Sequence, residues 1–102
     1  SFVMSFPVGT GIDLVHVFSN ASGVLENPSD SVCQVRMPTG ESYTYRYSEG
    51  SVTRDSTGVF RRRVLLSVPG DWVYRWTGTG SYPSTSGDCT VPVDPSDFSP
   101  VY

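Results

Sequence analysis

Few residues in this chain of 102 have the chemistry for catalysis. His16 is the only histidine, and an acid–base or triad role would require a nucleophile and a carboxylate beside it. Asp13 lies three residues away, so in an extended strand it points to the opposite face. We therefore expect His16 to be a strand histidine that is satisfied by backbone or solvent, and we expect no catalytic residue.

Metal ligands are equally sparse. One histidine and two widely separated cysteines match neither the count nor the spacing of a structural zinc site. Asp88, Asp94 and Asp97 bring oxygen ligands close together in sequence, but they form no ordered calcium loop. We expect no metal site and no cofactor.

Cys33 and Cys89 each belong to an alternating apolar run, Cys33-x-Val35-x-Met37 and Cys89-x-Val91-x-Val93. Both side chains should therefore point into a core, where a free cysteine behaves as a small hydrophobic residue. Two cysteines are too few to define a disulfide framework, so a bridged pair and two buried thiols both remain open.

The composition favours an all-β fold. One Ala, four Leu and no Lys stand against fifteen Val, nine Thr and thirteen aromatic residues, which suit a pleated surface better than a helix. Ten Gly and eight Pro divide the chain at short intervals, as expected for many short strands joined by turns. The length has room for one domain.

The charge balance limits the classes of partner. The net charge is −3 and all seven positive residues are Arg, whereas a nucleic-acid binder normally shows a broad basic stripe. No run of 18 apolar residues exists, and the first residues lack the charged start and long apolar run of a secretion signal. We expect no nucleic-acid partner, no membrane partner, and synthesis in a cytoplasm.

Alternation of apolar and polar residues predicts an immunoglobulin-like β-sandwich of seven to eight antiparallel strands over residues 11–93. Residues 1–10 are predicted to be an N-terminal arm or edge strand, since Pro7 and Gly9 interrupt them, and residues 94–102 a C-terminal arm, since Pro95 and Pro100 interrupt them. The strands are expected over residues 12–18, 31–37, 42–47, 52–54, 59–68, 72–76 and 89–93.

Three consecutive arginines lie in the predicted strand 59–68. Arg61 and Arg63 point together and should form an exposed basic pair beside Thr or carboxylate neighbours. Arg62 opposes them, so it must be paired or lie where the sandwich opens, because an unpaired buried charge is costly. A solvated strand face and an interface with an acidic protein surface are the two interpretations of the exposed pair.

Aromatic and apolar side chains supply the other candidates for partner binding. Tyrosines alternate on one face of the predicted strand 42–47, where they could pack in the core or contact a protein or glycan. Apolar residues at the chain ends have no obvious core to join, and exposed apolar arms are liabilities unless a partner covers them. These candidates are Tyr43, Tyr45, Tyr47, Phe2, Val3, Phe6, Phe98, Val101 and Tyr102, together with Arg61 and Arg63.

Two runs are more specific than their composition: VTRDSTGVF over residues 52–60 and PGDWVYRWTGTG over residues 69–80. The first contains a turn whose Gly58 can take a positive φ, and the second starts with another turn at Pro69-Gly70-Asp71. Trp72 and Tyr74 should fill the gap between the sheets.

Together these runs resemble small immunoglobulin-like virion proteins encoded among the head and head-to-tail genes of tailed bacteriophages. There, a Thr-Arg-Asp-x-Thr-Gly-Val-aromatic run leads to a Pro-Gly-x-Trp-x-Tyr-Arg-Trp-x-Gly-Thr-Gly run. The resemblance is good over residues 52–80, and a looser form of the pattern occurs in bacterial surface and periplasmic β-sandwich modules. Cys89, the triple arginine and the C-terminal tail depart from it.

The resemblance implies a non-enzymatic virion structural protein, either a capsid decoration or cement protein or a component of the head-to-tail neck. Its partners would be capsid or neck subunits, bound through the arms and sheet faces, with the chain repeated as a homo-oligomer in a symmetric assembly. The alternative is a bacterial extracellular or periplasmic module that binds glycan or protein through the tyrosine face. Position in the particle and copy number stay open.

Overall fold

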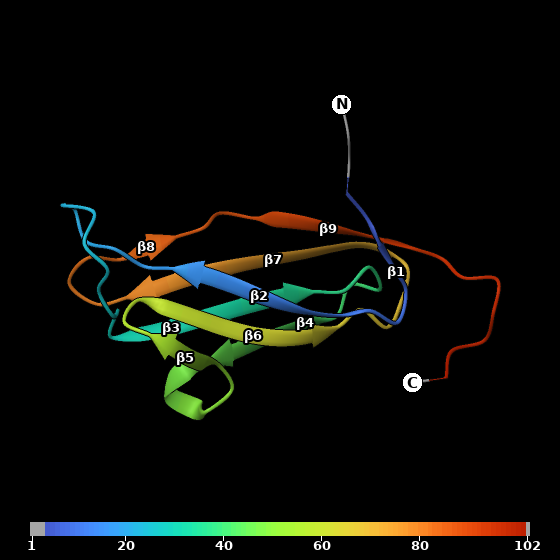
Figure 1. Cartoon of the computed structure of the whole chain (residues 1–102), viewed down its shortest axis with the longest axis horizontal. Coiled ribbons are helices and arrows are strands. Elements are labelled where there is room, and N and C mark those ends of the chain that lie inside the picture. The colour runs from blue at the N-terminus through green and yellow to red at the C-terminus, as the bar shows by residue number, and fades with distance from the viewer. Residues whose placement is uncertain (1–3, 102) are drawn as a thin grey trace.

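Two β-sheets packed face to face form the fold in the computed structural model, which describes residues 4–101 (Figure 1). The all-β sandwich prediction is confirmed. The described part holds nine strands rather than seven to eight, because β1 and β8 have two residues each and are too short to leave an alternation in the sequence. The elements are β1 (Phe6–Pro7), β2 (Gly11–Val17), β3 (Asp30–Arg36), β4 (Ser42–Arg46), η1 (Tyr47–Glu49, a 3-10 helix), β5 (Thr53–Ser56), β6 (Val59–Leu65), β7 (Gly70–Thr79), β8 (Ser84–Thr85) and β9 (Cys89–Asp94).

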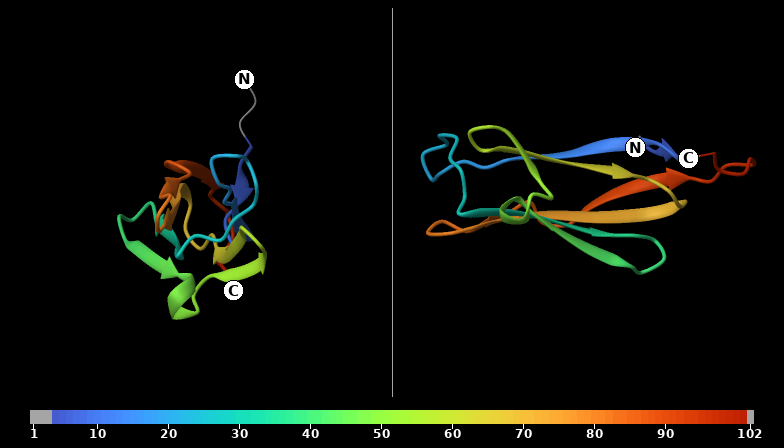
Figure 2. Two further views of the ribbon diagram at one scale, coloured as in Figure 1. Left: turned by 90° about the vertical axis from the view of Figure 1, so that its left-hand side faces the viewer. Right: turned by 90° about the horizontal axis from the view of Figure 1, so that it is seen from below.

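The larger sheet has the strand order β1-β9-β7-β3-β4, with β8 also paired to β7, and the smaller sheet has the order β2-β6-β5. Figure 2 shows the two layers from the end and from below. Every pairing among the described residues is antiparallel except that of β1 with β9, and β1 lies within the predicted N-terminal arm or edge strand. The consecutive strands β6 and β7 lie in opposite sheets, and the connection at Pro69 crosses the sandwich.

The inner faces of the sheets form one apolar core. Trp76 and Phe60 are its largest fully buried side chains, and Trp72 is also buried, as predicted. The indole Nε1 of Trp72 donates a hydrogen bond of 2.9 Å to the carbonyl of Val68, whereas Tyr74 is half-buried at the border of the core. Each buried aromatic ring contributes about 2–3 kcal/mol of apolar burial, so these rings account for much of the contact between the sheets.

Strand boundaries differ from the prediction most in β6 and β7. The predicted strand 59–68 ends at Leu65, whereas the predicted strand 72–76 extends over the ten residues of β7. Gly78 lies within β7 because it packs beneath Phe18, where an added Cβ would approach the ring carbon Cε1 to 2.7 Å. In a sequence, a glycine that close packing requires cannot be told from a glycine in a loop, so Gly78 was predicted outside the strand.

The N-terminal segment joins the larger sheet. Phe6 and Pro7 pair with Val93 and Asp94, and the backbone N–H of Val8 donates a 3.0 Å hydrogen bond to the carbonyl of Asp94. Phe6 and Val8 pack against the core, so this part of the predicted arm contributes to the sandwich. Residues 95–101 follow β9 outside both sheets.

Gly58 occupies the β5–β6 turn with a φ of 77°, which is the positive φ that the sequence predicted. The loop of residues 19–29 closes over this turn, and the backbone N–H of Gly58 donates a 2.7 Å hydrogen bond to Asn27 Oδ1. A Cβ at Gly58 would lie 2.5 Å from the carbonyl oxygen of Phe18. The glycine therefore lets the loop and the turn approach each other.

We expect the substitution Gly58→Ala to lower the free energy of unfolding much more than Gly50→Ala. The two glycines have almost the same φ, 77° and 78°, but a Cβ at Gly50 meets nothing within 4 Å. Gly50→Ala should cost about 1 kcal/mol for the left-handed backbone alone, and Gly58→Ala about 3 kcal/mol or more because backbone atoms must also move. Urea denaturation of both variants measures the difference, and equal costs would contradict the close approach.

Candidate interaction surfaces

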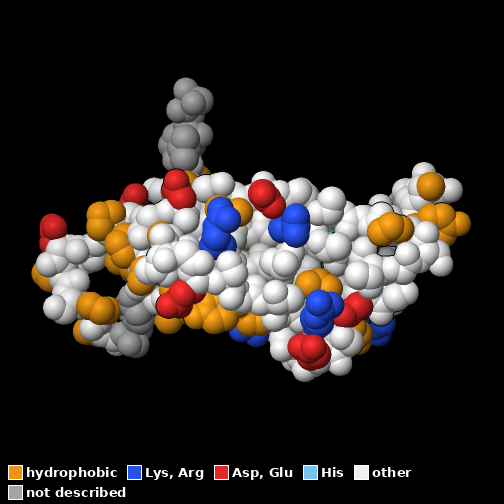
Figure 3. All heavy atoms as spheres, turned by 180° about the vertical axis from the view of Figure 1, so that it is seen from behind, with side chains coloured by type: hydrophobic (Ala, Val, Ile, Leu, Met, Phe, Trp, Pro, Cys, Tyr) orange, Lys and Arg blue, Asp and Glu red, His pale blue; other side chains and the backbone are white. Residues whose placement is uncertain are grey.

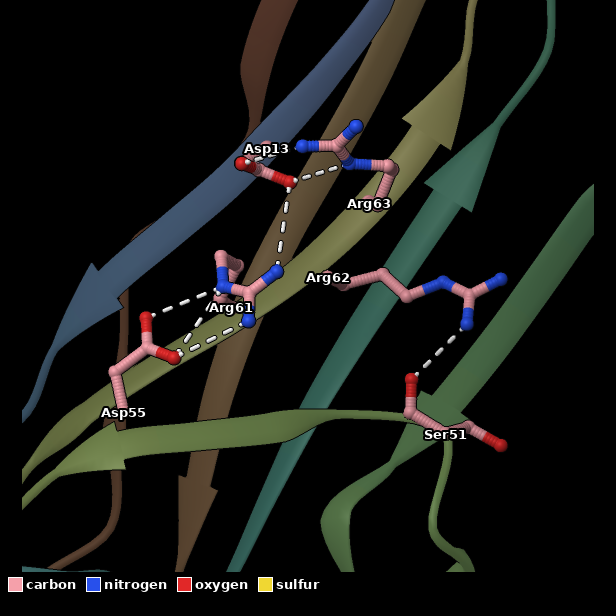
Figure 4. Close-up of polar contacts among 6 residues, drawn as sticks. All are labelled: Asp13, Ser51, Asp55, Arg61, Arg62 and Arg63. Carbon is pink, nitrogen blue, oxygen red and sulfur yellow. Dashed lines mark hydrogen bonds and ion pairs between the residues drawn. The ribbon is translucent and has the colours of Figure 1, made fainter.

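Arg61 and Arg63 lie on the outer face of the smaller sheet and bind carboxylates on both neighbouring strands (Figure 4). Arg63 holds Asp13 with two hydrogen bonds, of 3.0 Å from Nε to Oδ1 and 3.2 Å from Nη2 to Oδ2. Arg61 lies between Asp55, at 3.2 Å from Nε to Oδ2, and Asp13, at 3.8 Å from Nη1 to Oδ1. The four side chains form a continuous ladder of alternating charge.

This ladder neutralises itself, since two guanidinium groups face two carboxylates. The hydrogen bonds from Arg63 hold the pKa of the Asp13 carboxyl below its ordinary value, and they raise the pKa of Arg63 in turn. The charges of the predicted basic pair are thus matched within the same sheet. An acidic protein surface would have to compete with Asp13 and Asp55 for them.

Arg62 points to the opposite side of β6 and lies at the open edge of the sandwich. Its guanidinium carbon is 3.8 Å from the ring centroid of Tyr45. Its Nη1 donates a 3.2 Å hydrogen bond to the carbonyl of Ser51, which Figure 4 shows. The Nε atom is buried and has no hydrogen-bond partner within residues 4–101. Arg62 therefore covers the edge of the core mainly through its stacking on Tyr45. A cavity of about 230 Å³ lies beside it, lined by residues that include Met37, Tyr43, Val64 and Trp72.

The tyrosine stripe divides into packed and exposed members. Tyr43 and Tyr45 pair with Val35 and Cys33, so both lie on the inner face of β4, with their rings stacked at a centroid distance of 6.4 Å. Tyr47 begins η1 and contacts Phe60 edge to face at 5.3 Å. Tyr45 and Tyr47 thus take part in packing within the chain, and Tyr43 and Tyr47 also keep exposed surface, 44% and 41%. A hydrogen bond of 2.9 Å to Glu41 raises the pKa of the Tyr43 hydroxyl.

The C-terminal tail holds the most exposed apolar side chains of the described residues. Phe98 is 84% exposed and Val101 is fully exposed, at 101% of its reference area. The tail borders a groove of about 520 Å³ that is lined largely by apolar residues, including Val8, Pro69, Pro95 and Pro100. Phe2, Val3 and Tyr102, the other candidates at the chain ends, lie outside the described residues.

A further apolar surface lies at the opposite end of the molecule, and the sequence analysis missed it. Val24, Leu25 and Tyr82 are exposed there on loops around a pocket of about 220 Å³, and Figure 3 shows hydrophobic side chains at both ends. Asn20 Oδ1 accepts hydrogen bonds from the backbone N–H groups of Ser22 and Val24, which fixes the loop. The sequence does carry a signal for this surface, because large apolar residues lie within turn-rich segments that show no alternation.

The two cysteines face the core, as predicted, and both are free. They lie on β3 and β9, with β7 between them. Two strand spacings amount to about 10 Å, beyond the Cα separation that a disulfide spans. Burial raises the pKa of the Cys33 thiol to about 12.

His16 packs its ring between Phe18, at a centroid distance of 4.7 Å, and Trp76, at 6.4 Å. Burial lowers its pKa, which favours the neutral imidazole. Asp13 lies on the other face of β2, where it binds the arginines. His16 is therefore part of the packing around Trp76.

Across residues 4–101, no three His, Cys, Asp or Glu side chains come together in a way that could hold a metal ion. The described part of the chain also contains no helix with the length and apolar character needed to cross a membrane. No protein-family profile, curated protein or solved structure matches the chain.

We expect Arg62→Met to change the free energy of unfolding by no more than about 1 kcal/mol, because an apolar chain can replace a partly satisfied guanidinium on Tyr45. Arg62→Glu should cost about 3 kcal/mol, since it places a carboxylate against a carbonyl and a ring face. Urea denaturation measures both, with Arg54→Met on the exposed strand β5 as the control. A large loss in Arg62→Met would show that the charge itself is required.

We expect Cys33 to resist labelling by a thiol reagent in the folded protein. With a pKa of about 12, about one thiol in ten thousand is ionised at pH 8. Because folding raises this pKa from 9.0, the stability that the protonated thiol contributes is complete below pH 9 and is lost as the pH rises toward 12.

The variant Cys89→Ser leaves Cys33 as the single thiol for this measurement, and Cys33→Ser reports on the half-buried Cys89 for comparison. Labelling of Cys33 in native buffer at the rate of an unfolded chain would contradict its burial.

Proposed function

We propose that the chain is a non-enzymatic structural protein of a tailed-bacteriophage virion, a capsid decoration protein or a component of the head-to-tail neck. It binds neighbouring virion subunits through its C-terminal tail and its outer surfaces. The proposal starts from the resemblance carried by residues 52–60 and 69–80. Those two runs contain β5, the first two residues of β6 and the whole of β7, which include the Gly58 turn and Trp76.

The strand order supports the immunoglobulin-like part of this proposal. In such domains the strands B, E and D share one sheet, and G, F and C share the other, with C′ added in variable-type domains. If β2, β3, β4, β5, β6, β7 and β9 correspond to B, C, C′, D, E, F and G, the strand orders match B-E-D and G-F-C-C′, although no described strand takes the place of A beside B.

The observation that carries the binding role is the exposed C-terminal tail. The core is complete without Phe98 and Val101, yet the chain holds both in solvent beside an apolar groove. Apolar surface of this kind marks a site that a partner covers. In a symmetric particle, many copies of a weak anchor act together, so two side chains per copy contribute to firm attachment.

Glycan binding through the tyrosine face is the second candidate, and the structure supports it less well. A sugar-binding platform needs open ring faces, but Arg62 covers Tyr45, and Tyr47 contacts Phe60 at nearly a right angle. Tyr43 and Tyr47 both keep exposed surface, and of these two only Tyr43 lines a polar groove, of about 240 Å³. Retention of the chain on a polysaccharide column, lost in Tyr43→Ala, would favour this candidate.

We expect Phe98→Ser with Val101→Ser to abolish incorporation into particles while leaving the melting temperature unchanged, because neither side chain belongs to the core. Mass spectrometry of purified particles measures incorporation when the variant replaces the natural chain. Ser96→Ala with Ser99→Ala changes the same tail without removing apolar area and is the matched control. Full incorporation of the first variant would overturn the role of the tail.

Deletion of residues 1–4 tests the N-terminal end separately, because a longer deletion would remove Phe6 and Val8 from the core. The shorter deletion should leave the fold intact, as judged by its melting temperature. Reduced incorporation is then expected if this end also contacts a neighbour.

A further inference from the structure

We propose that the free edge of β2 pairs with the β2 edge of a second copy of this chain, antiparallel and across a two-fold axis. The two small sheets would then join into one continuous sheet. This inference goes beyond the proposed function, since it concerns the purified chain and holds whether or not the protein belongs to a particle. It is carried by the backbone pattern of β2, the exposed side chains beside it and the match between their charges.

The hydrogen-bond pattern identifies which backbone groups β2 leaves open. Phe18 N–H donates a 2.7 Å hydrogen bond to the carbonyl of Gly58, which lies opposite it in the register of β2 with β6. Hydrogen-bonded pairs alternate along an antiparallel ladder, so the backbone groups of Asp13, Val15 and Val17 face away from β6. No strand of residues 4–101 pairs with that side of β2.

β2 lacks the features that protect the other edges. β5 has a register shift between Arg54 and Ser56, and β1 has two residues, one of them Pro7. β4 has five residues and ends at η1. β2 has seven residues, with no proline, lysine or register shift, so it is the longest flat edge of the described sheets. An edge of this kind is a template for pairing with another strand.

Side chains beside the edge add apolar area to the open backbone groups. Val15 and Val17 are each 49% exposed on the outer face of the small sheet, and Leu65 is similarly exposed opposite Gly11. The charged residue on this face of β2 is Asp13, and its carboxylate is bound by Arg61 and Arg63. The edge therefore offers no unmatched charge that would repel a second copy.

One register matches these residues best, with Leu14 of both copies on the two-fold axis. Val17 then lies opposite Gly11 of the second copy. The row that runs from Val59 to Val17 in the first copy therefore continues through this Gly11 to Leu65 of the second copy. Val15, beside Arg61 in its own sheet, lies opposite Asp13 of the second copy. The row through Val17 is then apolar, and the row through Val15 brings Arg61 of one copy toward Asp13 of the other.

The neighbouring registers are less favourable. A two-fold axis at Asp13 places the two Asp13 carboxylates directly opposite each other, and like charges at opposed positions destabilise a sheet. An axis at Val15 brings the rows of Arg61 from both copies together. The axis at Leu14 avoids both contacts and uses the outward backbone groups of Asp13, Val15 and Val17.

The first test is amide hydrogen exchange of the full chain by NMR over a series of protein concentrations, with sedimentation velocity on the same samples. The amides of Val15 and Val17 should become protected as the sedimenting mass rises to that of a dimer, while amides of the β4 edge stay unchanged. Protection of these amides in samples that sediment with the mass of a monomer would assign the edge to the chain's own N-terminal residues. That result, or exchange without protection at any concentration, would overturn the proposal.

Substitutions of Val15 test the pairing and its register. Val15→Pro removes an outward N–H that β6 does not use, and it should abolish the dimer. Val15→Glu should weaken association about tenfold, because two symmetric contacts then bring the new carboxylate against Asp13 of the second copy. Val15→Lys should strengthen association, because its positive charge then lies opposite Asp13 of the second copy.

Thr44→Glu and Thr44→Lys are the matched controls, since they place the same charges at the edge of the larger sheet. Equal effects of Glu and Lys at position 15, or weaker association of the Thr44 variants, would overturn the register. If Val15→Pro fails to fold, the comparison of Val15→Glu with Val15→Lys still tests the pairing.

Discussion

The burial of Trp76 between the two sheets is the interaction on which the rest of the structure depends. Its side chain is 0% exposed, it lies opposite Cys33 on β3, and its ring stacks with His16 of the other sheet. Its indole Nε1 is buried without a hydrogen-bond partner among the described residues, which costs about 1–3 kcal/mol. Apolar burial of a ring this size offsets that cost, and two hydrogen bonds of 2.9 Å with Ser86 tie its backbone to the chain next to β8. The centre of β7 is thereby fixed from both sides.

The unequal size of the sheets explains the arginine cluster. A six-stranded sheet faces a three-stranded one, so the inner face near β4 extends beyond the smaller sheet. Arg62 crosses this border and covers Tyr45, because a long side chain with a flat charged end can lie on a ring and still reach the solvent edge. Its neighbours Arg61 and Arg63 point outward by the alternation of the strand and bind Asp55 and Asp13 instead. One run of three like charges thus serves two different surfaces.

The parts of the fold that follow from local pattern could be predicted from the sequence. Alternation placed the cysteines inward and Arg62 opposite its neighbours, and the turn chemistry of residues 55–58 assigned a positive φ to Gly58. The missed features depend on contacts between distant residues. Gly78 belongs to a strand because Phe18 packs on it, and the partners of Arg61 and Arg63 follow from the order β2-β6-β5. Neither contact leaves a local signal, and the parallel β1–β9 pair is too short to leave one.

The two kinds of exposed surface differ in the assemblies that they can build. Pairing of β2 with itself is isologous, so it closes at two copies and cannot continue. The contact that we propose for the C-terminal tail is different, because Phe98 and Val101 would insert into a partner of another kind, and heterologous contacts form rings or open arrays. The tail follows β9 in the larger sheet, whereas β2 belongs to the smaller one, so neither contact uses the residues of the other. A pair joined at β2 would present two tails related by a two-fold axis, and both could anchor the pair to a symmetric neighbour at once.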